Sequence, residues 1–503
     1  MKLLKGVLPL IIFVQTAFAQ VVVEFPKNRM VIQRDLSNKG QLLVSGFVEK
    51  PADTVKVRFL PFARNTGIAT AWNDCRVFNK DGKTTFFLTQ TVTAGWYKMQ
   101  VHAFKNGLVS DSAVVDRVGV GEVFLIAGQS NAQGQANRGS LSSVDIHQRV
   151  NVILGSDDRL NAQPSFEYHS LASYFPIYPI GSSSWCWGEL GDMLVNKLNV
   201  PVMFFNAAWG GSSSENWAQS IDSLSTNEAY RGEVPYHVLK RTIQFYRNTV
   251  GFRAVLWHQG EADSFQNQAN ARLPRADYFN NVKKVITTSR NQAGELLPWV
   301  VSRASYIYNL QDSLIIKDQN RLSIEVANVF RGPYTDTLTN SRIDNLHFSN
   351  SSAGQGLTKL ANSWNIALDS VFFTTAVPLL PDYNKASFIL TDGSVSRPTG
   401  YTPASWGGSG RSFGFLTDKT GNVFISPLLR CNERRLDMYK LPNQDNLNAI
   451  TGVNRSTADR EITLNRKIET QNLRISASQY ILLKPGFEVT PSTTFVAEIN
   501  GCY

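Results

Sequence analysis

The chain of 503 residues is 43% hydrophobic and 18% charged, which excludes a disordered chain as the default and, at this length, a single hydrophobic core, so we expect two or three domains. Its 50 Lys and Arg against 40 Asp and Glu give a formal net charge of +10. Since no dense basic run is present, we predict no nucleic-acid partner, and the excess charge favours either solubility or an acidic glycan partner.

The first residues have the pattern of a secretory signal. Lys2 and Lys5 precede the apolar stretch 8–14 and the cleavage sequence Ala17-Phe18-Ala19, so residues 1–19 are predicted to be a signal peptide outside the fold. No later segment approaches the roughly 18 uninterrupted apolar residues of a membrane span. We therefore expect a secreted or periplasmic protein without a transmembrane segment, and attachment to a cell surface stays open.

The four cysteines, Cys75, Cys186, Cys431 and Cys502, are too few for a disulfide scaffold, although export permits bridges. Their three possible pairings all remain open. None lies in a Cys-x-x-Cys or Cys/His cluster, so we predict no metal site.

Residues 20–117 alternate in the manner of β-strands. Short β-branched and aromatic runs are separated by turn formers such as Asn79-Lys80-Asp81-Gly82, which predicts an immunoglobulin-like β-sandwich. The runs are QLLVSGFV, TVKVRFLPF, TTFFLTQTV and GWYKMQVHAF.

From residue 118 to 372 the pattern becomes strand, polar turn and helix. This alternation predicts an α/β domain with a largely parallel sheet covered by helices on both faces. The expected strands are 123–127, 201–207, 254–258 and 299–304, and the expected helices include 278–289 and 357–370. Residues 373–503 return to strand and turn and are predicted to form a β-rich C-terminal module without an internal repeat.

The stretch FLIAGQSNAQGQ, residues 124–135, joins a buried strand to a small polar turn. Ser130 follows the strand at the start of a helix, where a free backbone N–H and the helix dipole favour a developing negative charge. The residue is therefore a candidate nucleophile. An ordinary helix N-cap is the competing interpretation.

Two further strand ends carry groups that suit an oxyanion. Gly210 and Gly211 form a turn after the strand 201–207 and expose a backbone N–H, and Gln259 places an amide after the strand 254–258. Glu261 and Asp263 follow it, and they fit loop bracing better than an acid/base pair.

Asp344 and His347 are three residues apart in a predicted turn. At this spacing a carboxylate can accept from one imidazole nitrogen while the other nitrogen faces a nucleophile. Ser351 or Ser352 is predicted to cap the helix that follows.

Taken together, GQSN, the Gly-Gly turn, WHQGEAD and DNLH resemble, in order, the sequence blocks of SGNH (GDSL-like) hydrolases. The similarity is to the secreted sialate O-acetylesterase-like branch and spans about residues 118–370. It implies a flavodoxin-like, three-layer catalytic domain and a serine esterase that removes acetyl groups from carbohydrates.

The resemblance also implies a role for each matching residue. Ser130 would be the nucleophile, His347 the general base and Asp344 the group that orients it. The oxyanion hole would comprise the backbone of Ser130, the Gly210–Gly211 turn and the Gln259 side chain. At the position of Gln259 the wider superfamily has an asparagine. The implied chemistry requires no metal and no cofactor.

Several interpretations stay open at this stage. Acetylated sialic acid and acetylated xylan would use the same catalytic residues, and a non-catalytic carbohydrate-binding surface protein is an alternative of another class. Tryptophans near the motifs could stack on sugar or pack in the core; they are Trp185, Trp187, Trp209 and Trp217. His258 fits a packed strand residue better than a second base.

Overall fold

The computed structural model describes residues 21–80, 82–154, 167–171, 176–222, 234–269, 274–351 and 353–383, together with the backbone of short strands between 388 and 498. The predicted signal peptide lies outside these residues. Within them, no helix combines the length and the apolar character needed to cross a membrane.

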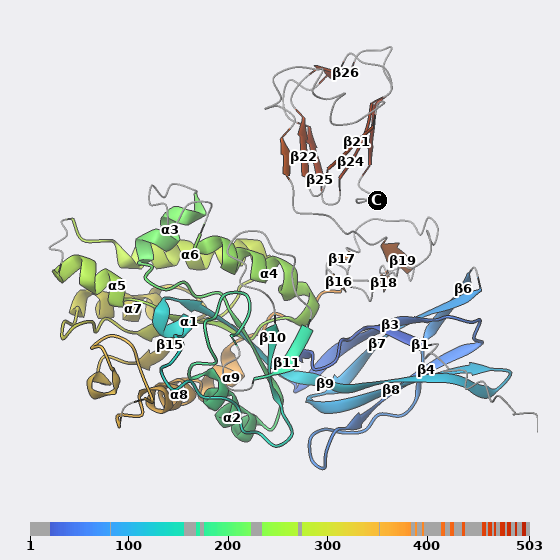
Figure 1. Cartoon of the computed structure of the whole chain (residues 1–503), viewed down its shortest axis with the longest axis horizontal. Helices are drawn as coiled ribbons and strands as arrows, with labels where there is room; N and C mark the ends of the chain where they lie inside the picture. Colours follow the sequence, from blue (N-terminus) through green and yellow to red (C-terminus); the bar gives the residue numbers. More distant parts are fainter. Residues whose placement is uncertain are drawn as a thin grey trace, which may run out of the picture.

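Two sheets, largely antiparallel, form the N-terminal part, which is blue in Figure 1. One sheet has the order β1-β3-β7-β6, and the other is built from β4, β5, β8 and the first half of β9. The four predicted runs are β3, β4, β7 and β8. The strands are β1 (Val21–Phe25), β2 (Val31–Gln33), β3 (Lys39–Val48), β4 (Thr54–Pro61), β5 (Asn73–Asp74), β6 (Arg76–Lys80), β7 (Lys83–Thr93), β8 (Gly95–Lys105) and β9 (Leu108–Gly128).

The long strand β9 belongs to two sheets in succession. Residues 108–120 pair with β8 in antiparallel register, and residues 122–128 pair in parallel with strands of the central sheet. The boundary expected between residues 117 and 118 therefore falls inside a continuous strand.

The central sheet has the order β11-β10-β12-β9-β13-β14-β15, with every neighbouring pair parallel except β10 and β11. Without the β10–β11 edge, its strands follow the flavodoxin-like order 2-1-3-4-5. The strands are β10 (Val150–Leu154), β11 (Glu167–Ser170), β12 (Val202–Asn206), β13 (Ala254–His258), β14 (Trp299–Arg303) and β15 (Val329–Tyr334).

Helices cover both faces of this sheet (Figure 1). Alternate residues of β9 explain why: Leu125 packs in the core beneath α4 and α6, whereas Phe124 and Ile126 pack beneath α2 and α8. The helices are α1 (Ser130–Gln133), α2 (Trp187–Leu198), α3 (Ser214–Ile221), α4 (Tyr236–Val250), α5 (Glu261–Ser264), the π-helix η2 (Phe265–Ala269), α6 (Tyr278–Ala293), α7 (Ser313–Glu325), the 3₁₀-helix η3 (Thr339–Ser341), α8 (Gly356–Ala367) and α9 (Ser370–Thr375).

The C-terminal part contains short strands, in agreement with the strand-rich prediction. β20, β22 and β25 pair in parallel, as do β21, β24 and β27, and β23 with β26. The strands are β16 (Phe388–Ile389), β17 (Val395–Ser396), β18 (Gly414–Thr417), β19 (Val423–Ser426), β20 (Arg435–Asp437), β21 (Arg455–Ala458), β22 (Glu461–Leu464), β23 (Lys467–Ile468), β24 (Leu473–Ala477), β25 (Tyr480–Leu483), β26 (Glu488–Val489) and β27 (Phe495–Glu498).

The structure excludes one of the possible disulfide pairings. Cys75 and Cys186 are buried with free thiols and do not form a disulfide with each other. Cys431 and Cys502 lie outside the described residues.

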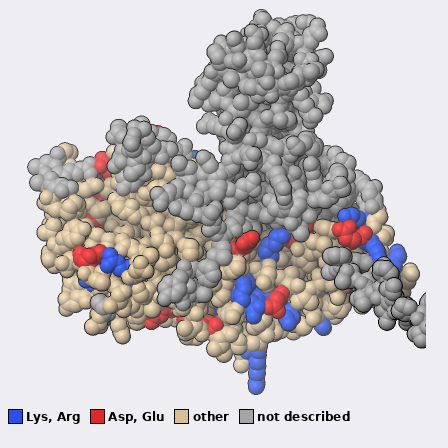
Figure 2. All heavy atoms as spheres, viewed as in Figure 1, with Lys and Arg blue, Asp and Glu red and all other residues tan. Residues whose placement is uncertain are grey.

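Surface charge on the face drawn in Figure 2 is mixed. Lys and Arg side chains alternate with Asp and Glu over the described surface and do not gather there into one basic patch.

A buried ion pair ties the N-terminal sheets to the central sheet. The Glu122 carboxylate on β9 accepts from Arg253 Nε at 2.6 Å and Nη2 at 2.9 Å, from Arg34 Nε at 2.7 Å and from Gln33 Nε2 at 3.0 Å. Burial alone would raise the pKa of Glu122, but the two guanidinium groups hold this pKa below its ordinary value. The carboxylate is therefore charged at neutral pH.

We expect Glu122→Gln to lower the free energy of unfolding by about 3–5 kcal/mol, because it leaves the Arg253 guanidinium buried without its counter-charge. Urea unfolding measures the loss. The matched control is Glu49→Gln, which removes an exposed carboxylate 2.6 Å from Lys83 and should cost less than about 1 kcal/mol. Equal losses in the two variants would contradict the assignment.

Candidate active site

The turn that carries Ser130 begins where β9 ends. Gly128 has φ +124°, and a Cβ atom there would lie 2.1 Å from the His258 carbonyl oxygen, so only glycine fits. The next backbone N–H, from Gln129, donates to the same oxygen at 2.9 Å. Gln129 is the N-cap of α1 and Ser130 is its first residue. The N-cap interpretation of Ser130 is therefore wrong.

Three of the predicted residues form a hydrogen-bonded series. Ser130 Oγ lies 2.9 Å from His347 Nε2, and His347 Nδ1 lies 2.8 Å from Asp344 Oδ2. Asp344 Oδ1 also accepts the His347 backbone N–H at 2.6 Å. Burial would raise the pKa of Asp344, but its hydrogen bonds to His347 hold this pKa below the ordinary value. An ionised carboxylate can thus fix the imidazole with Nε2 toward the serine.

Ser130 and His347 line a pocket of about 770 Å³, a size that suits a small organic ligand. The lining is rich in amide side chains and includes one pair of aromatic rings in contact, Phe265 and Tyr308. It comprises Gln129, Ser130, Gln133, Gly134, Gln135, Ala136, Ser182, Gly210, Gly211, Ala262, Phe265, Gln266, Ile307, Tyr308, Leu346 and His347.

Gly210 and Gly211 line this pocket as the sequence led us to expect, but the Gly210 N–H is engaged. It donates to Gln133 Oε1 at 2.9 Å, and Gln133 Nε2 in turn donates to the Ile180 carbonyl at 2.9 Å. Gly210 could donate to a ligand only by giving up this bond. Its role as an oxyanion donor stays a prediction.

The Gln259 amide is buried and does not belong to the pocket lining. Its Nε2 donates to Asp263 Oδ2 at 2.5 Å and to the Ser212 carbonyl at 3.2 Å, and lies 3.3 Å from Gln129 Oε1. Both amide protons thus have acceptors within the protein. Direct contact between Gln259 and an oxyanion stays a prediction and would require this amide to rotate.

Gln129, which sequence reasoning overlooked, lines the pocket beside Ser130. Its Oε1 accepts from the backbone N–H groups of Gly260 at 3.2 Å and Ala262 at 3.1 Å, in addition to Gln259. Three donors on one oxygen fix the amide with its oxygen toward α5. Its NH₂ group is therefore held away from α5, in a residue that faces the pocket. The position immediately before Ser130 was the available signal.

Glu261 and Asp263 brace loops, as predicted. Asp263 accepts from the Ser214 backbone N–H at 2.9 Å and from its hydroxyl at 2.5 Å. Glu261 Oε1 accepts from Asn131 Nδ2 at 2.9 Å and lies 3.2 Å from His258 Nε2. His258 is fully buried, which confirms its interpretation as a packed strand residue.

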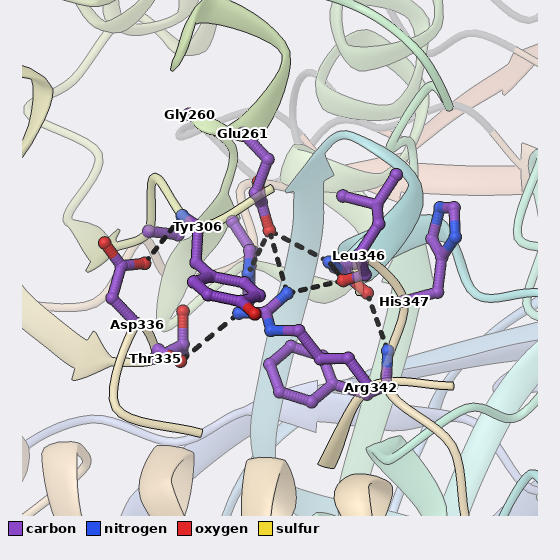
Figure 3. A network of polar contacts seen from close by, with 12 residues as sticks. Gly260, Glu261, Tyr306, Thr335, Asp336, Arg342, Leu346 and His347 are labelled. Atoms are coloured by element: carbon purple, nitrogen blue, oxygen red, sulfur yellow. Dashed lines mark hydrogen bonds and ion pairs between the residues drawn. The ribbon is translucent and has the colours of Figure 1, made fainter. Parts of the chain in front are cut away.

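A buried arginine links this bracing to the turn before His347 (Figure 3). The Arg342 guanidinium lies between Glu261 Oε1, at 3.9 Å, and the Leu346 carbonyl, to which it donates at 2.5 Å. The same carbonyl accepts from Asn131 Nδ2 at 3.1 Å. The guanidinium also stacks over the Phe348 ring, with its Cζ atom 4.0 Å from the ring centroid. Two donors thus fix the peptide that immediately precedes His347.

Burial decides the role of most of the tryptophans. Trp185, Trp187 and Trp217 are fully buried and pack in the core, while Trp209 is only partly buried. The indoles of Trp185 and Trp187 donate to the carbonyls of Asn131 and Ala132, at 2.9 and 3.1 Å. These two side chains support the serine turn from behind.

The predicted cap of α8 is wrong. The helix begins at Gly356, too far along the chain for Ser351 to be its N-cap, and Ser352 lies outside the described residues. Asn350 Oδ1 caps the helix instead, because the intervening turn brings it within 2.8 Å of the Leu357 N–H and 3.3 Å of the Thr358 N–H. The described residues contain no cluster of three or more His, Cys, Asp or Glu that could hold a metal ion.

Comparison with known proteins finds one matching family. Residues 120–364 match the family model described as carbohydrate esterase, sialic acid-specific acetylesterase. The comparison with curated protein sequences gives no match.

Solved structures with similar folds include a carbohydrate acetylesterase from Xanthomonas citri, with 15% identity and a TM-score of 0.43 over 78% of this chain and 80% of that one. A protein of Arabidopsis thaliana has 19% identity and a TM-score of 0.33 over 51% of this chain and 98% of its own. NanS has 14% identity and a TM-score of 0.32 over 49% and 96%. With TM-scores this low, these likenesses carry no functional argument.

We expect Arg342→Met to slow labelling of Ser130 by an organophosphorus reagent, by up to roughly 100-fold, because the Leu346 carbonyl loses one of its two donors and the His347 turn shifts. Mass spectrometry of the labelled Ser130 peptide measures the rate. Arg331→Met, at an exposed position on β15, is the matched control and should label at the unaltered rate. Unchanged labelling of the Arg342 variant would show that the turn keeps its position without the Arg342 hydrogen bond.

Proposed function

Residues 120–364 belong to the sialic acid-specific acetylesterase family of carbohydrate esterases, and from this premise we propose that the chain hydrolyses O-acetyl esters of sugars with Ser130 as nucleophile. The observation that carries the proposal is the hydrogen-bonded series from Ser130 through His347 to Asp344, in which Ser130 and His347 line the pocket. We assign the activity to the domain predicted over residues 118–372. The signal peptide predicted for residues 1–19 favours a substrate outside the cytoplasm.

The proposed mechanism has two halves. Ser130 Oγ attacks the acetyl carbonyl carbon while its proton passes to His347 Nε2, and the resulting tetrahedral intermediate collapses as the same proton passes to the sugar oxygen that leaves. Water then attacks the acetyl-serine, again giving its proton to His347. Release of acetate returns that proton to Ser130. Asp344 stabilises the imidazolium in both halves.

The oxyanion requires donors that are available when the substrate arrives. The backbone N–H of Ser130, at the first position of α1, is one. We propose the Gln129 NH₂ group as a second, since its amide orientation is fixed by three donors to its oxygen. Gly210, Gly211 and Gln259 remain proposed donors, and for Gly210 and Gln259 the internal hydrogen bonds must first exchange.

Two sugar classes are candidates for the substrate. The family description favours O-acetylated sialic acid. A neutral acetylated polysaccharide such as xylan is favoured by the lining of the pocket, in which four glutamines offer uncharged donors and acceptors of the kind that pair with sugar hydroxyls. The two candidates differ in whether the ligand carries a carboxylate.

The test is acetate release by the mature chain from O-acetylated sialic acid and from acetylated xylan in parallel. We expect release from at least one substrate, and we expect Ser130→Ala to abolish it because the nucleophile is lost. Release that survives in the Ser130 variant, or no release from any acetyl ester, would contradict the proposal.

We expect Gln129→Ala to lower kcat by roughly 10²–10³-fold with a smaller effect on KM, because it removes a donor that acts mainly in the transition state. Steady-state kinetics on the better sugar acetate measures both constants. Gln41→Ala, at an exposed position on β3, is the control. A rise in KM alone would reassign Gln129 to substrate binding.

A further inference from the structure

Tyr308 is an exposed aromatic residue in the lining of the Ser130 pocket. It lies between β14 and α7, lines the pocket and keeps 51% of its surface exposed. The tryptophans that the sequence suggested for sugar contact are mostly buried, whereas Tyr308, which no sequence motif marks, is more exposed than Phe265 in the described lining of the pocket.

The backbone at Tyr308 is held in an unfavourable conformation. Tyr308 has φ +47° and the next residue, Asn309, has φ +65°. Asparagine tolerates the left-handed region, but a bulky aromatic residue there is strained. Such strain persists only where the surrounding structure imposes it, and it is concentrated at functional sites.

Two contacts impose the position of Tyr308. Its backbone N–H donates to the Asn345 carbonyl at 2.9 Å, and Asn345 lies between Asp344 and His347 in the proposed catalytic turn. Its ring packs edge to face with Phe265, with centroids 5.8 Å apart and planes at 76°. The main chain thereby ties Tyr308 to the catalytic turn, and Phe265 fixes the ring.

An edge-to-face partner covers at most one face of the Tyr308 ring. Tyr308 is 51% exposed and lines the pocket, which leaves room for a ligand beside its ring. The C–H faces of pyranose rings are apolar and flat enough to stack on an open aromatic face. A pyranose stacked there would enter the pocket that contains Ser130.

We propose that Tyr308, supported by Phe265, is the stacking platform for the pyranose ring that carries the acetyl ester. The inference rests on the proposed esterase function and adds a sugar subsite to it. Stacking acts on the sugar and leaves the chemistry at the acetyl group unchanged. Removal of the ring should therefore weaken the use of sugar esters and spare esters without a sugar.

The experiment compares kinetics on acetylated xylo-oligosaccharides, O-acetylated sialic acid and p-nitrophenyl acetate, for the full mature chain. For Tyr308→Ala and Tyr308→Gly we expect kcat/KM on the accepted sugar ester to fall roughly 3- to 10-fold, mainly through KM. Turnover of p-nitrophenyl acetate should fall less than turnover of the sugar ester, and Tyr308→Phe should keep the sugar activity.

Tyr308→Gly separates binding from folding. Glycine adopts φ +47° without strain, so this variant should keep its melting temperature while it loses sugar affinity. The matched control is Tyr334→Ala, which removes a tyrosine side chain with 39% exposure on β15. This variant should leave the kinetics on both kinds of substrate unchanged.

An unchanged KM for the sugar ester in Tyr308→Ala would overturn the platform while the esterase stands. Equal losses on sugar ester and p-nitrophenyl acetate would also overturn it, because they indicate damage to the catalytic turn. If the unaltered chain hydrolyses no acetyl ester, the proposed function itself fails, and the platform fails with it.

Discussion

The pairing of β9 with β13 through their last residues is the constraint on which the site depends. At Gly128 the two backbones approach so closely that the His258 carbonyl occupies the space of a side chain. The chain can then turn at once into α1, with the Gln129 N–H on the same carbonyl. Because parallel strands end at a common edge, this register brings the loops after β9, β12 and β13 together. Ser130 is at the centre of that edge.

His347, in contrast, lies in an irregular turn, and buried polar groups replace the regular backbone bonds that a strand would provide. The Leu346 carbonyl is held by Asn131, from the serine turn itself, and by Arg342. In a dry environment such hydrogen bonds are strong, and each unmet partner is costly. The peptide before His347 is thus positioned by contacts in which neither the serine nor the histidine side chain takes part.

Much of the fold could be predicted from the sequence, because apolar strand runs and strand-end motifs are local signals. The series Ser130, His347 and Asp344 was predicted for the same reason: each residue lies in a short motif. The orientation of a buried amide side chain, in contrast, could not be predicted from the sequence. Gln259 turns to Asp263, and Gln129 is oriented by α5, so these choices depend on contacts that form only in three dimensions. Arg342 and Tyr308 belong to no motif, and their roles follow from burial and backbone conformation.

The continuity of β9 also determines how the N-terminal sheets are attached to the catalytic sheet. One strand passes from the pairing with β8 to the serine turn without a linker, and the buried Glu122 carboxylate joins it to Arg34 and Arg253 where the two sheets meet. The N-terminal sheets therefore differ from a domain on a flexible linker, because β9 and the Glu122 ion pair hold them in one orientation relative to the Ser130 pocket.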